Sequence, residues 1–338
     1  MSLVVVDADV LGRQRTGDET YVANLLRELA ELAPAADVRV AAVTRHLELV
    51  PEGIEPLPLA TRVQELRMAW ALPRLLRRVG ADLVHTQYAV PLRCPCPAVV
   101  TVHDLSFERD PASMPKKDLR VFRSVVPRAV RQAARVLTVS QRSRHDLEEL
   151  YGVPAEKIVV TPNGVDPVFR PGEVGRRDYV LAVGSVEPRK NHRAALVAAR
   201  EAGLPLVIAG PEKDRALAAE LRRGGARLEG YVEPERLAEL YRGAACLVQA
   251  SRYEGFGLPV LEAMASGTPV VIVPEPALQE VVGGAAVVAA EDELAAGIRA
   301  AVAERDRLVW AGLERARAFS WRTTAERTLE VYREVLGS

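Results

Sequence analysis

The chain has 338 residues, of which 49% are hydrophobic and 27% charged, as in folded globular proteins, and this length suits two domains. Basic and acidic side chains balance at 45 each, so the net charge is zero and gives no reason to expect a nucleic-acid partner. Three cysteines are too few for a disulfide framework and indicate a reducing compartment.

The sequence shows neither a signal peptide nor a membrane span. The first residues, M-S-L-V-V-V-D, lack a basic region and a long apolar region, and no run of about 18 apolar residues occurs elsewhere. Cys94 and Cys96, in R-C-P-C-P, lack the spacing and the second cysteine pair of a zinc site, so we interpret them as buried or semi-exposed thiols beside prolines. We expect a cytoplasmic protein.

Short apolar runs alternate with helical patterns along the first half of the chain. Their near-continuous hydrophobicity predicts strands covered on both faces, as in a parallel sheet. Helical spacing puts Tyr21, Leu25, Leu29 and Leu32 on one face, and puts Leu66, Trp70 and Leu76 on another. The strands are expected at Leu3–Asp7, Val38–Val43, Leu83–His85, Ala98–Val102, Val136–Val139 and Ile158–Val160.

The alternation pauses over Thr161–Asp178, where proline, glycine and charge cluster as in a linker, and then resumes. The fold class predicted is α/β, with two doubly wound Rossmann-like domains over residues 1–165 and 166–318 and a ligand cleft between them. Residues 319–338 form a final amphipathic helix, and whether it packs back on the first domain is left open by its periodicity. The second strand series is expected at Tyr179–Val183, Leu206–Ala209, Ala226–Leu228, Cys246–Gln249, Val270–Val273 and Ala286–Val288.

The segment S-R-Y-E-G-F-G-L-P-V-L-E-A-M-A-S-G predicts a turn from a strand into a helix. Pro259 suits the first helical turn, and Gly267 ends the helix. The backbone N–H groups at such a helix start bind phosphate, and Gly255 and Gly257 let a ligand approach closely.

Two glutamates, Glu254 and Glu262, flank this turn. Carboxylates repel phosphate but accept bonds from hydroxyls, so a nucleotide sugar fits the pattern. Glu262 would bind the ribose, the turn the phosphate, and Glu254 the transferred sugar. The alternative is that Glu254 caps the helix and Glu262 is a solvated helix residue. The full string favours the functional interpretation.

This string, E-G-F-G-L-P-V-L-E-A-M-A-S-G-T-P-V-V, closely resembles the E-x7-E signature of the retaining glycosyltransferases of family four, which have the GT-B fold. The resemblance covers nearly the whole chain. Further motifs that look like those of the family are R-T-G-D-E-T-Y-V-A-N-L-L, T-V-H-D-L-S-F, T-V-S-Q-R-S-R-H-D-L, V-T-P-N-G-V-D and V-G-S-V-E-P-R-K-N-H.

Two motifs supply the remaining predicted catalytic residues. Arg189 and Lys190 follow a strand and precede a helix, where cations are unfavourable unless they serve a ligand, and they could reach a departing diphosphate. By resemblance, Lys190 is the diphosphate residue, and Arg189 substitutes for an arginine that many members carry where Ser185 stands. His103 follows a strand, and the resemblance implies that it contacts the donor sugar; a histidine satisfied by its neighbours is the alternative.

The predicted catalytic residues are therefore His103, Arg189, Lys190 and Glu254. Resemblance places the base pocket near Gly230, and it makes Gly17 a turn residue that approaches phosphate or acceptor. Ordinary turn and capping roles, with Asp18 as a helix cap, are the alternatives. The substrate-binding residues are predicted to be Gly17, Ser140, Asn163, Gly184, Tyr231, Val232, Leu237, Gly255, Phe256, Gly257, Leu258 and Glu262.

Neither a metal nor a cofactor is expected. Asp7 and Asp9 match D-x-D, but the fold class usually needs no metal. A basic stretch from Lys116 to Arg135 could touch anionic lipid, giving a peripheral enzyme at the inner face of a membrane with a lipid-linked acceptor, or it could be a solvated helix face.

We expect an enzyme that transfers a hexose, such as mannose, from a GDP- or UDP-linked sugar to a glycan, lipid-linked or small-molecule acceptor. The resemblance implies retention of configuration by front-face attack, and a role in cell-envelope or polysaccharide biosynthesis. Two alternatives stay open: a nucleotide-sugar epimerase on the same fold, and a non-catalytic carbohydrate-binding protein. A dinucleotide oxidoreductase is disfavoured because the first strand lacks G-x-G-x-x-G.

Overall fold

A computed structural model describes residues 1–13, 16–173 and 178–337 of the chain. The chain forms two compact units. The first comprises Met1–Glu108, Met114–Gly164 and Trp321–Ser338, and the second comprises Arg109–Ser113 and Val165–Ser320. The predicted linker contains this change of unit, although its residues 174–177 lie outside the described residues. Arg15, the first residue of the R-T-G-D motif, also lies outside them.

The first unit is built on a seven-stranded parallel sheet in the order β3-β2-β1-β4-β5-β6-β7. Six strands confirm the predicted ones with ends moved by at most two residues. Strand β3 was not predicted, because it is an edge strand in which two of four residues are proline and only Leu57 is buried. The strands are β1 Ser2–Asp7, β2 Val38–Thr44, β3 Glu55–Pro58, β4 Leu83–Gln87, β5 Ala98–Val102, β6 Arg135–Thr138 and β7 Ile158–Val160.

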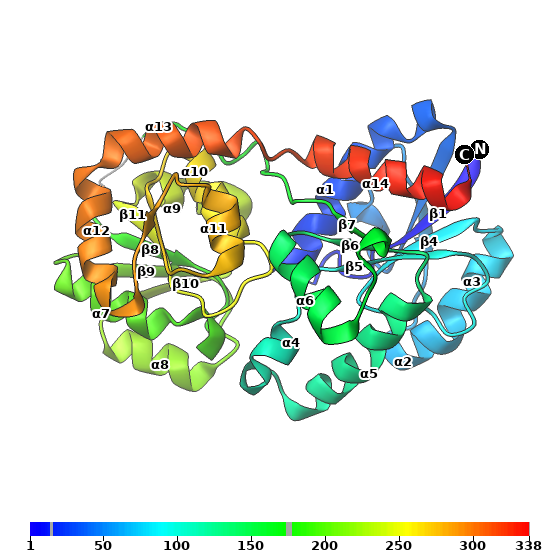
Figure 1. Ribbon diagram of the computed structural model, residues 1–338, viewed down its shortest axis with the longest axis horizontal. Helices are drawn as coiled ribbons and strands as arrows, with labels where there is room; N and C mark the ends of the chain where they lie inside the picture. Colours follow the sequence, from blue (N-terminus) through cyan, green and yellow to red (C-terminus); the bar gives the residue numbers. More distant parts are fainter. Residues whose placement is uncertain (14–15, 174–177, 338) are drawn as a thin grey trace. The chain divides into compact units, whose positions relative to one another are not determined.

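Two helices from opposite ends of the chain, α1 (Thr16–Leu32) and α14 (Trp321–Leu336), lie side by side in the first unit (Figure 1). Tyr332 of α14 and His85 of β4 are buried and share a hydrogen bond of 2.5 Å between the hydroxyl and Nδ1. Thr324 donates a hydrogen bond of 2.6 Å to the carbonyl of Pro162. The last helix of the chain therefore completes the first unit.

The other helices of this unit are α2 Gln64–Leu66, α3 Leu72–Val79, α4 Ser106–Arg109, α5 Lys116–Gln132 and α6 Gln141–Tyr151. Leu66 and Trp70 do not share a buried face with Leu76, so that prediction is wrong. A π-helix at Arg67–Ala71 adds a residue to the turn, which turns Arg67 inward and leaves Leu66 and Trp70 59% and 63% exposed.

The second unit is built on a six-stranded parallel sheet in the order β10-β9-β8-β11-β12-β13. All six predicted strands are confirmed within two residues at either end. They are β8 Val180–Val183, β9 Leu206–Ala209, β10 Arg227–Gly230, β11 Cys246–Gln249, β12 Val270–Ile272 and β13 Val287–Val288.

Buried aliphatic side chains of these strands face helices that follow them in sequence, as expected of a doubly wound sheet. The predicted Rossmann-like architecture of both units is therefore confirmed. The helices are α7 His192–Glu201, α8 Arg215–Arg223, α9 Pro234–Gly243, α10 Leu258–Ala265, α11 Pro276–Val282, α12 Leu294–Ala303 and α13 Arg305–Ala316. Among the described residues, no helix combines the length and apolar character needed to cross a membrane.

Candidate functional site

The predicted elbow joins the end of β11 to the start of α10. Gly257 precedes the helix with φ +113°, and a side chain there would bring a Cβ atom to 2.7 Å from Cδ2 of Leu278. Only glycine fits this conformation and this space. Pro259 lies in the first helical turn, where its missing N–H costs nothing.

Glu254 lies in this elbow and is buried, with 6% of its surface exposed. Its Oε1 accepts hydrogen bonds of 2.7 Å from Lys190 Nζ and of 2.7 Å from Gln249 Nε2. Burial alone would raise the pKa of Glu254, but the positive charges of Lys190 and Arg189 outweigh it and bring that pKa down to about 2. Glu254 is therefore an oriented carboxylate, available to accept hydroxyl bonds.

Lys190 ends a short 3-10 turn, η6 (Pro188–Lys190), that follows β8. Asn191, in the left-handed conformation at φ 51°, separates this turn from α7, so Lys190 lies just outside that helix. The Lys190 side chain passes over Gly184, where an added Cβ would lie 3.3 Å from Lys190 Cε. Two predicted site residues, Gly184 and Lys190, are thus brought together, and Glu254 contacts the lysine.

Arg189 has partners both in the elbow and beside its own 3-10 turn. Its guanidinium donates to the carbonyl of Tyr253 at 2.8 Å and to Glu187 at 2.9 Å. The backbone N–H of Arg252 donates in turn to the Arg189 carbonyl at 3.0 Å. Arg189 therefore fastens the 3-10 turn to the elbow and positions Lys190 beside Glu254. Glu187 was not singled out from the sequence, although it stands in the same quoted motif.

Glu262 lies on the α10 helix and is only 8% exposed, so its interpretation as a solvated helix residue is wrong. The hydroxyl of Tyr241 donates to it at 2.8 Å. Burial raises the pKa of Glu262 to about 7, against the Tyr241 hydrogen bond, which lowers it, while the charge of Asp166 adds to the rise. Sequence reasoning missed Tyr241, whose only signal was its spacing four residues after Leu237 on one helix.

The remaining predicted donor residues divide between loop and core positions. Phe256 is buried, and its ring packs edge-on against Phe319 at 5.8 Å between centroids, which leaves its backbone for any ligand contact. Leu258, the first residue of α10, is partly exposed, as are Val232 and Leu237; Tyr231 is exposed. Tyr231 and Val232 lie between Gly230, which has φ +71°, and the start of α9, and Leu237 lies in the first turns of that helix.

In the first unit, His103 follows β5 and is buried among aromatic rings. The Tyr21 ring lies edge-on to it at 4.7 Å between ring centroids, and the Tyr88 ring is tilted at 5.7 Å. Its Nε2 lies 3.4 Å from Gln87 Oε1 and 4.0 Å from Asp18. Burial lowers the pKa of His103, partly offset by nearby carboxylates, which favours the neutral imidazole.

Three other predicted residues of the first unit take different positions. Gly17 lies within α1, and an added Cβ would meet nothing within 4 Å. Asp18 also lies inside this helix rather than capping it. Ser140 caps α6 by accepting the N–H of Ser143 at 3.1 Å. Asn163 is buried, and its Oδ1 has no hydrogen-bond partner among the described residues.

The two carboxylates of the D-x-D motif form ion pairs with arginines. Asp7 accepts two hydrogen bonds from the buried Arg67 at 2.5 and 2.6 Å, and Asp9 pairs with Arg45 at 2.9 Å. Both carboxylates are therefore neutralised by protein. Within residues 1–13, 16–173 and 178–337, no group of three or more candidate ligands gathers to hold a metal ion.

Comparison with known proteins identifies the family. Residues 15–169 match the model of Glycosyltransferase Family 4, and residues 168–316 match that of Glycosyl transferases group 1. The O-antigen chain mannosyltransferase B of Escherichia coli is 34% identical, with 70% of each chain covered. The chain is a family 4 glycosyltransferase.

Other similarities of this glycosyltransferase extend over its whole length. A D-inositol 3-phosphate glycosyltransferase from Acidothermus cellulolyticus is 30% identical, with 95% of this chain and 86% of that one covered. The structure of sucrose-phosphate synthase from Thermosynechococcus elongatus matches with a TM-score of 0.78 at 21% identity, covering all of both chains. The predicted GT-B fold class is confirmed.

Proposed function

We propose that this glycosyltransferase moves a hexose, mannose or a similar sugar, from a nucleotide diphosphate sugar to an acceptor hydroxyl with retention of configuration. The observation that carries the proposal is the contact of 2.7 Å between Lys190 and Glu254 at the entry to a helix. The positive charge of Lys190 suits a departing diphosphate, and the carboxylate of Glu254 suits the hydroxyls of the sugar. Relatives named as mannosyltransferases support the choice of sugar.

The donor would extend along the elbow. Lys190 and the backbone amides at the start of α10 would hold the diphosphate, because cations and helix N-termini stabilise anions. Glu254 would accept the hydroxyls of the transferred sugar, Glu262 those of the ribose, and the segment Tyr231–Leu237 would line the base pocket. His103 of the first unit would contact the donor sugar. No cofactor or metal is required for these contacts.

Transfer would proceed by attack on the face from which the diphosphate leaves. The acceptor oxygen bonds to the anomeric carbon as the bond from that carbon to the phosphate oxygen breaks. The acceptor proton passes to the departing diphosphate, whose growing negative charge Lys190 stabilises. Glu254 stays ionised and holds the sugar, and Arg189 keeps the turn and the elbow together.

We also propose a cytoplasmic enzyme that meets a lipid-linked or glycan acceptor at a membrane surface. Helix α5 buries Val126, Ala129 and Val130 and exposes its basic side chains, with Asp118 as the acidic residue of its first turn. Such a surface suits anionic headgroups. Co-sedimentation with anionic vesicles, lost in Lys116→Gln/Lys117→Gln, would support this contact; equal sedimentation with neutral vesicles would contradict it.

The donor is tested by calorimetry and thermal melting with GDP, UDP, ADP and dTDP and their sugars. One nucleotide is expected to stabilise the protein, by about 2.7 kcal/mol at a hundredfold excess over its Kd. Glu262→Ala should weaken this effect, whereas Glu201→Ala, at the exposed last residue of α7, should not. Absence of binding by every nucleotide to the folded protein would contradict the proposal.

The stereochemistry is tested on the product. With the donor identified, NMR of the newly formed glycosidic bond should show the anomeric configuration of the donor. Inversion would contradict the front-face mechanism, and conversion of the sugar nucleotide without an acceptor would support an epimerase instead.

A further inference from the structure

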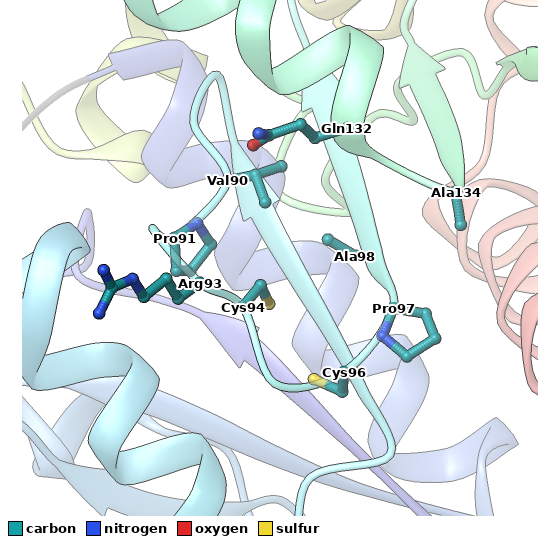
Figure 2. A pocket seen from close by; sticks show the side chains of 9 residues that line it. All are labelled: Val90, Pro91, Arg93, Cys94, Cys96, Pro97, Ala98, Gln132 and Ala134. Atoms are coloured by element: carbon teal, nitrogen blue, oxygen red, sulfur yellow. The ribbon is translucent and has the colours of Figure 1, made fainter.

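A cavity of about 330 Å³ lies in the first unit, beside the loop that joins β4 to β5 (Figure 2). It is lined by the loop residues Val90, Pro91, Arg93, Cys94, Cys96 and Pro97 together with Ala98, Gln132 and Ala134. Because the loop enters β5 at its amino end and His103 follows its carboxyl end, the cavity lies at the opposite edge of this sheet from His103. The proposed transfer therefore makes no use of it.

The two thiols of R-C-P-C-P face this cavity from the same loop. Cys94 and Cys96 are both half-buried, in contrast to the fully buried Cys246. Figure 2 shows them on either side of the loop's bend, and the sulfur atom of each cysteine lies on the side nearer the other one. Both residues line the cavity wall. Two thiols two residues apart on one loop, at the wall of an accessible cavity, can react as a pair.

The two sulfur atoms differ in charge. The neighbouring Cys96 thiol lowers the pKa of Cys94 to about 7, against partial burial, and the charge of Arg77 lowers it further. The neighbouring Cys94 thiol and burial raise the pKa of Cys96 well above its usual range. The thiolate is the nucleophilic form, so Cys94 can attack while Cys96 keeps its proton.

The loop holds this arrangement at a cost in backbone conformation. Tyr88 and Arg93, neither of them glycine, adopt left-handed φ angles of 58° and 52°. Such strain persists only where the surroundings fix the conformation. Arg77 does so here, because its Nη2 donates to the carbonyl of Arg93 at 3.2 Å. Arg77 thus both holds the loop and favours the thiolate, while Arg93 places a positive charge on the cavity wall.

We propose that Cys94 and Cys96 form a thiol–disulfide exchange site for a small anionic disulfide that enters this cavity. The Cys94 thiolate attacks one sulfur of that disulfide, whose S–S bond breaks and releases a thiolate that takes up a proton. Cys96 then loses its proton and attacks the Cys94 sulfur of the mixed disulfide. A Cys94–Cys96 bond forms and a second small thiol leaves. The protein dithiol is oxidised by two electrons, and the small disulfide is reduced to two thiols.

The test uses oxidised glutathione as the probe, followed by mass spectrometry and alkylation. The wild-type chain should lose two hydrogen atoms in mass, keep no glutathione, and protect both loop cysteines from iodoacetamide. Cys96→Ser should accumulate one glutathione on Cys94. Cys94→Ser should react at least about tenfold more slowly, because Cys96 is protonated. Unchanged melting temperatures of the serine variants show that the fold is intact, and no readout depends on transferase activity.

Two matched comparisons test the electrostatics. Arg77→Gln should slow the attack, whereas Arg78→Gln, at the neighbouring exposed position of α3, should not. Oxidised glutathione should react with the protein faster than cationic cystamine does, once each rate is divided by the rate of the same probe with a simple thiol in solution. A glutathione adduct that persists on the wild-type chain, or equal rates for Cys94→Ser and Cys96→Ser, would overturn the proposal.

Discussion

Replacing Lys190 by alanine is expected to lower kcat about 10³-fold at saturating donor, as does the removal of a group that stabilises charge in the transition state. The lysine side chain is 12% exposed and lies 2.7 Å from Glu254, where water could not replace it without a cost in free energy. The measurement is the initial rate with the donor identified by calorimetry and with a glycan or lipid-linked acceptor.

The same substitution should lower the free energy of unfolding. Above pH 4.5, ionised Glu254 is stabilised by its partners, and this stability is lost as the pH falls towards its folded pKa of about 2. Without Lys190, Glu254 keeps Arg189 at 3.5 Å, so we expect a loss of about 3 kcal/mol, the lower end of the range for a broken buried pair. Urea unfolding at pH 7 measures it.

Arg193→Ala is the matched control for both effects. Arg193 lies three residues further along the chain, in an exposed ion pair with Glu220. It should leave kcat unchanged and change stability by less than about 1 kcal/mol. A Lys190→Ala variant with wild-type kcat would contradict a catalytic role for Lys190.

Replacing Glu262 by glutamine is expected to make the protein more stable at pH 8, while weakening the binding of its donor nucleotide. The folded-state pKa of Glu262 is raised from 4.5 to about 7, so the stability of the wild type is full below pH 4.5 and declines as the pH rises through 7. The shift corresponds to about 3 kcal/mol. Glutamine stays neutral and can still accept a hydrogen bond from the Tyr241 hydroxyl, so the stability of the variant should not decline over this pH range.

The measurement is the urea-unfolding free energy of both proteins from pH 4.5 to 8. The two curves should meet near pH 4.5 and separate above it, with the variant on top. Glu235→Gln, at an exposed position, should follow the wild type. Parallel wild-type and Glu262→Gln curves would show that this carboxyl does not titrate near neutrality. Such a stability cost at a residue that we propose to bind the donor is the expected exchange of stability for function.

The strands and the elbow could be predicted because their signals are local. Apolar β-branched runs mark buried parallel strands, and the Gly257–Pro259 sequence fits one conformation of a strand-to-helix turn. The edge strand β3 gave no such signal, since its prolines and exposed residues resemble a loop. The π-helix at Arg67–Ala71 was missed because the buried bond from Arg67 to Asp7, 60 residues away, outweighs the local pattern.

The sequence motifs nominate candidate site residues but do not give the contacts between them. The motif containing Lys190 and the one containing Glu254 lie 64 residues apart, and nothing in either says that they touch. Arg189 was assigned to the diphosphate, yet its hydrogen bonds run to Tyr253 and Glu187. Burial of Glu262 against Tyr241 likewise depends on how α9 packs on α10, which side-chain spacing in one helix cannot give.

The return of α14 to the first unit has a consequence for biosynthesis. A ribosome releases residues 165–320 before it releases Trp321–Leu336, so the second unit has its complete sequence first although it is encoded second. Until the last helix emerges, Tyr21 lacks its neighbour Trp321, and His85 lacks the Tyr332 hydroxyl. This reverses the usual order, in which the earlier domain folds first during translation. A nascent chain that stops before the final helix would leave an apolar face of its first unit uncovered, where quality-control chaperones could bind it.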